Sequence, residues 1–158
     1  GNFAGAVLVA ALCVSGHVFS AFGGKLAASV IAIAQTKAGL TFCDAFVRGI
    51  LCNFLVCIAV WMANAAKTAG GKIAAVFFPI MAFVVAGFEH SIANMYYLAA
   101  GIFTAGQTGA AAEGLTWGRA LIGNLLPVTL GNLVGGGLLV GVSAWYLYLK
   151  KGRNSVNS

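Results

Sequence analysis

Charged residues are scarce in this chain: they make up 8% of its 158 residues, and only three residues are acidic. A soluble domain usually carries about 25% charged residues, because it needs a polar surface to stay dissolved. With 61% hydrophobic residues and a mean hydropathy of +0.96, this chain has no such surface. The composition therefore excludes an ordinary soluble domain and predicts a protein whose solvent is lipid.

The chain also has no C-x-x-C pair and no disulfide-rich framework. Its cysteines lie in or at the edge of apolar runs, so we interpret them as packing residues and expect neither a metal site nor a cofactor; they are Cys13, Cys43, Cys52 and Cys57. The net charge of +6 would suggest nucleic acid in a soluble protein. Here the basic residues stand between apolar runs or at the C-terminal end, so we expect them to orient the protein and expect no nucleic-acid partner.

What the chain does have is long apolar runs. A bilayer core of about 30 Å needs roughly 20 apolar residues in a helix. Four stretches qualify, which predicts an all-α polytopic membrane protein with spans at about 3–22, 45–66, 73–103 and 121–149. Thr41 and Asp44 have the spacing of a capping box and would begin the second span.

The third span, 73–103, is too long for one upright helix, since about 31 residues at about 1.5 Å each give roughly 46 Å. Either a strong tilt or a break in the middle would solve this. Pro79 and Gly87 favour a break. Irregular backbone at membrane depth survives only inside protein or beside a water-filled cavity.

The fourth span contains Pro127, a candidate kink, and two G-x-x-x-G pairs suited to close helix packing. The pairs are Gly131 with Gly135 and Gly137 with Gly141.

Basic residues near the span ends predict the orientation. Lys67 and Lys72 lie between the second and third spans, and three more basic residues follow the fourth. The positive-inside rule then makes both groups cytoplasmic, including a C-terminal tail at 150–158. We therefore expect a multi-pass protein of the cell inner (plasma) membrane. Lys37 falls in the connection between the first two spans, on the outer side of the membrane. This is an exception to the positive-inside rule and suggests a functional role for Lys37.

Ionisable groups in a membrane are costly and usually face the bundle interior or a water-filled path. His90 lies near the middle of the third span and suits proton exchange near neutral pH. Glu89 would point about 100° away from it on a regular helix, so we assign Glu89 to holding the backbone of the break, near Gly87. Asn94, four residues after His90, would share its face.

Two other polar residues in the spans can be explained by structural roles. His17, in the first span, has no catalytic pattern around it and is interpreted as structural. Asn53, in the second span, could equally join helices or line a path.

Three stretches resemble segments of the formate/nitrite transporter family. They read G-I-L-C-N-F-L-V-C-I-A at 49–59, F-E-H-S-I-A-N-M at 88–95 and N-L-L-P-V-T-L-G-N-L-V-G-G-G at 124–137. The resemblance implies an aquaporin-like bundle, assembled as a homopentamer of six-helix protomers, that passes small monovalent anions of weak acids and is not an enzyme. Formate, nitrite, hydrosulfide and lactate are such anions.

The resemblance also implies that the four spans are the third to sixth of six. The family's first two helices, with a threonine beside the histidine, would then be missing from this chain. The chain would be either one piece of a nicked protein or a truncated form, and we expect the missing helices to accompany it.

The resemblance assigns roles to five residues. His90 is similar to the central pore histidine, and Lys37 to a lysine whose positive field reaches the vestibule. Asn53 matches an asparagine near the centre, Phe83 an aromatic that narrows the pore, and Val56 could join that constriction.

Several alternatives stay open. His90 could protonate the anion or only donate a hydrogen bond to it, and transport could be passive or coupled to protons. In a different class of function, His17 and His90 could ligate a haem in an electron-transfer subunit. The chain could also be a purely structural membrane subunit.

Overall fold

The computed structural model describes residues 1–150, with side chains through Tyr148, and within these residues the chain forms helices and turns but no strand. The all-α prediction is thus confirmed. The predicted tail at 150–158 lies outside the described residues apart from the backbone of Lys150.

The chain divides into two compact units. The first contains Gly1–Ala45 and His90–Pro127, and the second contains Phe46–Glu89 and the segment from Val128 onward. The division falls between Glu89 and His90, so these two neighbours belong to different units.

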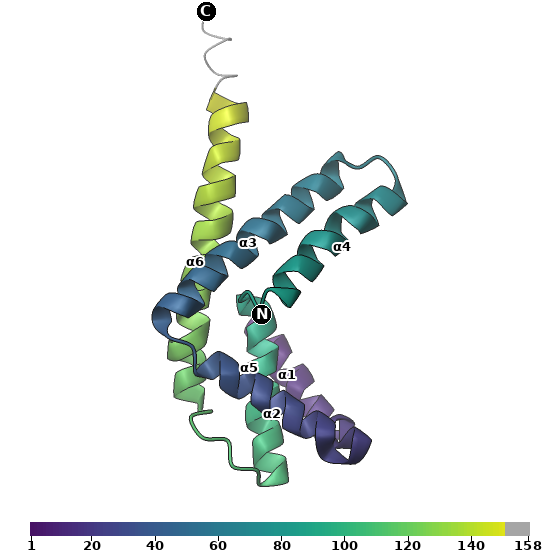
Figure 1. The fold of residues 1–158 in the computed structure, drawn as a ribbon, viewed down its shortest axis with the longest axis vertical. Helices are drawn as coiled ribbons and strands as arrows, with labels where there is room; N and C mark the ends of the chain where they lie inside the picture. Colours follow the sequence, from purple (N-terminus) through teal and green to yellow (C-terminus); the bar gives the residue numbers. More distant parts are fainter. Residues whose placement is uncertain (151–158) are drawn as a thin grey trace, which may run out of the picture. The chain divides into compact units, whose positions relative to one another are not determined.

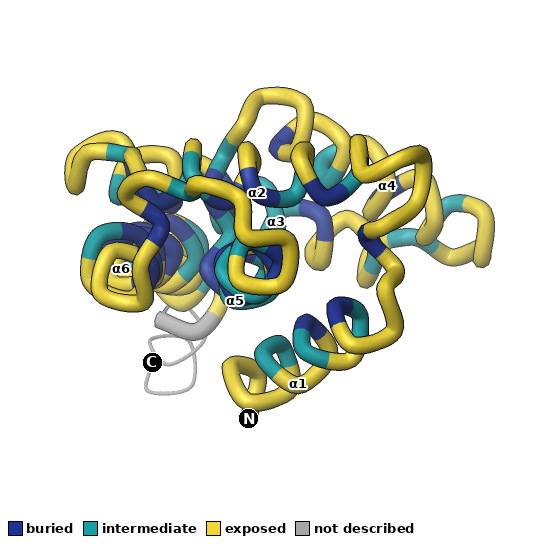
Figure 2. Tube along the Cα trace, turned by 90° about the horizontal axis from the view of Figure 1, so that it is seen from below, coloured by how far each residue is buried: buried dark blue, intermediate teal, exposed yellow. Residues whose placement is uncertain are grey.

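Five helical segments begin and end in the first unit (Figure 1): α1 (Asn2–Ser15), a 3-10 helix (Val18–Gly24), α2 (Lys25–Ala38), α5 (Ser91–Thr108) and a π-helical segment (Arg119–Leu125). α5 packs against both α1 and α2. Small residues permit this: a Cβ added to Gly101 of α5 would overlap the side chain of Ala34 in α2. α1 is buried along one side only, as Figure 2 shows.

The predicted first span, 3–22, differs from the helix that the structure contains. α1 ends at Ser15, and Gly16 caps it. His17 and Phe22 then adopt the left-handed region, with φ of 54° and 56°, and Gly23 and Gly24 also have positive φ. These conformations interrupt a helix. α2 follows, between the predicted first and second spans, where the sequence predicts only a connection.

The second unit contains α4 (Ala69–Val85) and most of α3 (Phe42–Ala65) and of α6 (Leu126–Leu133), which is continued by π-helical segments at Val134–Val142 and Trp145–Lys150. α3 begins as predicted, because Thr41 Oγ1 accepts a hydrogen bond from the Asp44 N–H (3.1 Å) and donates one to its carboxylate (2.7 Å). At α4, Thr68 Oγ1 likewise accepts from the Gly71 N–H (3.0 Å).

α3 and α6 pack at glycines. A Cβ added to Gly131 or Gly135 would overlap the carbonyl oxygen of Phe46 or Ile50, respectively. The first predicted G-x-x-x-G pair is therefore a packing site. The second pair is not a packing site among the described residues, because a Cβ on Gly137 would meet nothing within 4 Å. A Cβ on Gly141 would meet only the backbone oxygen of Gly136, in its own helical segment.

Three stretches of the described chain are long and apolar enough to cross a membrane, by length and composition: Val18–Ala38, Phe42–Ala65 and Arg119–Tyr148. α1 and α4 are shorter apolar helices. α4 continues through Pro79 to Val85, and α5 begins at Ser91, so residues 73–103 are shared between two helices.

Candidate functional site

The segment between α4 and α5 turns away from helical geometry at Gly87, whose φ is +67°. The Phe88 N–H donates to the Phe83 carbonyl (3.0 Å), which closes the last turn of α4. A positive φ favours glycine, since a side chain there would be strained. Gly87 is therefore the residue at which the chain leaves the helix, as its backbone conformation requires. Pro79, the other residue expected to favour a break, lies inside α4 and does not end it.

Glu89 is 3% exposed, and its backbone is held on both sides within the second unit. Its N–H donates to the Arg48 carbonyl of α3 (3.3 Å), and its carbonyl accepts from Asn132 Nδ2 (3.0 Å). Glu89 and His90 both precede α5, so the angle of about 100° that we expected between them on a regular helix does not apply.

His90 is the N-cap residue of α5 and is half-buried. Its Nδ1 accepts a hydrogen bond from the Ala93 N–H at 3.4 Å, and its carbonyl accepts from the Asn94 N–H at 2.9 Å. An Nδ1 that accepts carries no proton, which makes Nε2 the N–H of a neutral ring. The cap therefore sets which ring nitrogen can donate.

Within the first unit, a series of hydrogen bonds through Asn94 and Asn124 connects the start of α5, at His90, with the end of α2, at Lys37. Asn94 Nδ2 donates to Asn124 Oδ1 (2.8 Å), and Asn124 Nδ2 donates to the Lys37 carbonyl in the last turn of α2 (2.9 Å). Asn94 is 1% exposed and Asn124 is fully buried. Buried amides bonded in this way fix the positions of the backbones that they join. We call this the Asn94–Asn124 cluster.

The Lys37 side chain is half-buried and lies over an aromatic ring of the same unit. Its ammonium stands 5.6 Å from the centroid of the Tyr97 ring of α5. This is within the range of a cation–π interaction.

Asn53 belongs to a second cluster, in the second unit. Asn53 Nδ2 donates to the Asn132 carbonyl (2.6 Å), and Asn132 Nδ2 donates to the carbonyls of Gly49 (2.8 Å) and Glu89. The two asparagines thereby join α3, α6 and the residue before His90. We call this the Asn53–Asn132 cluster.

Phe83 and Val56 are apolar, so their side chains take no part in either hydrogen-bonded cluster. Phe83 is buried in α4, with 9% of its surface exposed, and Val56 is half-buried in α3.

Sequence reasoning did not assign roles to Asn124, Asn132 and Tyr97. A signal for the asparagines was present, since G-N-L occurs at 123–125 and again at 131–133 in an apolar run. The hydrogen-bond partners of these two asparagines lie 30 to 87 positions away in the chain, so a local sequence pattern could not identify them.

The two histidines lie near opposite ends of α5, His90 at its start and His17 beside Gln107 near its end. Gln107 Nε2 lies 3.4 Å from His17 Nδ1 and donates to the Val14 carbonyl (2.8 Å). Gln107 is near the end of α5 and His90 caps its start, which separates them by about 25 Å of helix. This geometry does not support a shared haem. Nor do the described residues contain a group of three or more His, Cys, Asp or Glu placed to hold a metal.

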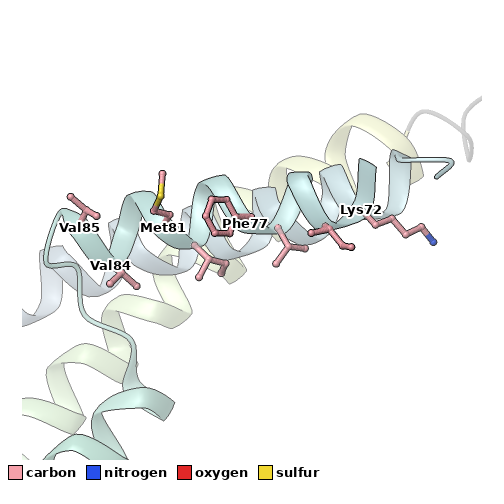
Figure 3. Close-up of a pocket in the computed structure, with 8 residues that line it drawn as sticks. Lys72, Phe77, Met81, Val84 and Val85 are labelled. Atoms are coloured by element: carbon pink, nitrogen blue, oxygen red, sulfur yellow. The ribbon is translucent and has the colours of Figure 1, made fainter. Parts of the chain in front are cut away.

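A groove of about 720 Å³ runs along α4, and Figure 3 shows its side chains following one side of the helix. Its lining is apolar except at one end: Lys72, Ile73, Val76, Phe77, Ile80, Met81, Val84 and Val85. No predicted site residue lines it, so we do not assign it to the chemistry.

Comparison with known proteins identifies relatives over nearly the whole chain. A family model described as formate/nitrite transporter matches residues 1–146. A "Probable formate transporter" of Methanothermobacter thermautotrophicus is 47% identical over 131 residues, covering 83% of this chain and 44% of the relative. "Formate channel FocA" of Escherichia coli (strain K12) is 39% identical over 163 residues, covering 96% and 57%. These relatives are named as a transporter and a channel and not as enzymes, as expected.

The solved structure of a "Pentameric formate channel with formate bound" resembles the chain with a TM-score of 0.83 and 37% identity, covering 93% of this chain and 62% of that one. The chain spans about half the length of the curated relatives that it matches. Together with its long apolar helices, these similarities show that the chain is an integral membrane protein.

Proposed function

Because this chain belongs to the formate/nitrite transporter family, we propose that it forms the histidine-bearing half of a membrane channel or transporter for small monovalent weak-acid anions. Formate is the first candidate, since related proteins are named for it, and nitrite and hydrosulfide share its charge and small size. The observation that carries the proposal is the position of His90, at the start of α5 directly after the segment that ends α4.

We propose that α4 and α5 are two halves of one membrane span, broken at 86–90 at membrane depth. The apolar length of 73–103 supports this, because one straight helix would exceed the bilayer core. In this scheme the spans are the third to sixth of six and cross the inner (plasma) membrane, with the C-terminus in the cytoplasm. The first two helices complete the protomer, and five protomers assemble, as in the pentameric relative.

The site residues then have distinct roles. His90 faces the anion, Lys37 supplies a positive charge, and Asn53 holds the centre of the passage together. Phe83 and Val56 narrow it.

Around them, Glu89, Gly87 and Asn94 shape the break. Two hydrogen bonds hold the backbone at position 89, and the role of the Glu89 carboxylate there stays a prediction. Gly87 is supported in this role by its positive φ, and Asn94 by its bond to Asn124.

The mechanism follows from the cost of dehydrating an anion. A bare anion loses much of its hydration energy in a narrow apolar passage. The positive charge of Lys37 and the N-terminal end of α5 reduce this cost by attracting the anion. At His90, Nε2–H can donate a hydrogen bond to it. A proton delivered through the imidazole would instead make the neutral acid, which crosses an apolar constriction at lower cost.

A selectivity series tests this function. The full-length protein in liposomes is expected to pass formate, nitrite and hydrosulfide much faster than chloride, because chloride is the anion of a strong acid and gains nothing from a proton. Influx of each anion is measured by stopped-flow. Protein-free liposomes are the control, since neutral weak acids also cross lipid unaided.

Two results would contradict the proposal. Chloride influx as fast as formate influx would indicate an unselective anion pore. Influx of no weak-acid anion above the control would indicate a structural membrane subunit.

A further inference from the structure

The loop that follows α5, residues 109–118, is fixed against the last turn of α2 within the first unit. Its Leu115 is buried and belongs to the same apolar cluster as residues of α2. Gln35 Nε2, near the end of α2, donates to the carbonyl of Glu113 in the loop (3.3 Å). Lys37 belongs to this part of α2 as well, so the loop lies beside the turn to which we assign a positive charge.

The side chain of Arg119 folds back over this loop. A Cβ added to Gly114 would lie 2.9 Å from Arg119 Nη1 and 3.7 Å from its Cζ, so the guanidinium rests against the glycine backbone. Gly114 has a φ of +74°, which favours glycine and keeps this place open. The Arg119 N–H donates to Thr116 Oγ1 (3.2 Å), which fixes the start of the arginine. The guanidinium therefore has a defined position.

Arg119 and the end of α2 also border the same glycine. A Cβ added to Gly123 would lie 3.9 Å from the Arg119 Cβ and 4.0 Å from the carbonyl oxygen of Ala38. Ala38 directly follows Lys37 in the chain. In the proposed topology, the connection that contains Lys37 and the one that ends at Arg119 lie on the same, outer side of the membrane. Two cations thus stand near one end of α2.

The Arg119 side chain is exposed, so its donors can reach a ligand. Among the residues whose side chains the structure describes, none forms an ion pair with the guanidinium or accepts a hydrogen bond from it. A guanidinium is planar and presents its N–H donors as a fixed fork that matches the two oxygens of a carboxylate. A lysine ammonium is a point charge without this geometry.

We propose that Arg119 captures the permeant anion at the outer entrance, with its guanidinium fork on the two oxygens of formate. This inference rests on the proposed anion transport and adds to it a specificity-determining residue that favours carboxylates. Capture precedes passage through the constriction. Loss of the fork would therefore weaken capture and leave the maximal rate of passage unchanged.

Two variants of the full-length protein in liposomes test the inference. Arg119→Gln removes the charge and the fork, and should raise the formate concentration that gives half-maximal influx by about two- to fivefold, as expected for an exposed ionic contact. Arg119→Lys keeps the charge and removes the fork, and should raise it by about twofold. Maximal influx should stay constant in both.

Lys25→Gln is the matched control, because it removes an exposed cation from the start of α2, about 18 Å along the helix from Lys37. It should leave the half-maximal concentration unchanged. Thermal unfolding in detergent checks that the variants are folded, and Arg119→Lys carries the test by itself if Arg119→Gln is unstable.

The results separate the two levels of the account. If the parent protein passes no formate above protein-free liposomes, the proposed function fails and the inference fails with it. If the parent passes formate and either Arg119→Gln or Arg119→Lys has the half-maximal concentration of the parent, only the inference is overturned. An equal increase in Lys25→Gln would also overturn it, since any surface cation would then have the same effect.

Discussion

Replacing Gly135 by alanine is expected to destabilise the protein by about 3 kcal/mol, although the change adds a single methyl group. In the structure an added Cβ would overlap the Ile50 carbonyl oxygen of α3 and lie 2.9 Å from the carbonyl carbon. Backbone atoms of a packed helix cannot swing aside as a flexible side chain does, so the helices must separate. Separation would also loosen the contacts at Gly131, one turn earlier.

Gly137→Ala is the matched control, since it lies two residues further on and its Cβ would meet nothing within 4 Å. The folded fraction of each full-length variant is measured in detergent after heating. Gly137→Ala should be unchanged or slightly stabilised, because alanine favours a helix over glycine by about 1 kcal/mol. Equal stability of the Gly135 and Gly137 variants would contradict the packing of α3 against α6.

Asn132→Leu is expected to have the next largest effect, since it removes the donor to two backbone carbonyls. Gly49 and Glu89 both receive hydrogen bonds from Asn132 Nδ2 in a buried environment. An unsatisfied buried acceptor costs about 1–3 kcal/mol, so we expect a loss of stability in the upper part of that range. Because the Glu89 carbonyl lies directly before His90 in the chain, formate influx should fall by about tenfold, which equals about 1.4 kcal/mol in the barrier.

Asn64→Leu, at an exposed position of α3, controls for replacing an amide by an apolar side chain. Thermal stability and formate influx are measured for both variants. An Asn132→Leu protein with the stability and influx of the control would show that the Asn53–Asn132 cluster does not hold the segment before His90.

Some of this fold could be predicted from sequence because the responsible signals are local. The capping box at Thr41 and Asp44 is a three-residue spacing, and its bonds are present. The packing of Gly131 and Gly135 is also a local signal, because a spacing of four residues places both glycines on the same side of a helix. By contrast, the end of α1 depends on the left-handed backbone conformation of His17, which could not be predicted from the presence of a histidine at this position.

The site was only partly predictable for a similar reason. His90 and Glu89 attract notice because ionisable residues are rare in an apolar run. An asparagine in such a run is ambiguous, since it can join helices or line a passage. Only the structure distinguishes Asn124, which bonds the end of α2, from Asn132, which bonds α3 and Glu89. The attraction between Lys37 and Tyr97 joins residues 60 positions apart and has no local pattern.

The central claim is that His90 handles the permeant anion. It is tested most directly by formate influx into liposomes at about pH 5.5 and about pH 7.5, on either side of the ordinary imidazole pKa of about 6.5. The full-length protein is compared with His90→Phe and His90→Asn, after thermal unfolding has shown that the variants remain folded. The account predicts that influx depends on pH in the parent protein, and that both variants lose most of that dependence. Influx and pH dependence that are unchanged in His90→Phe would contradict it.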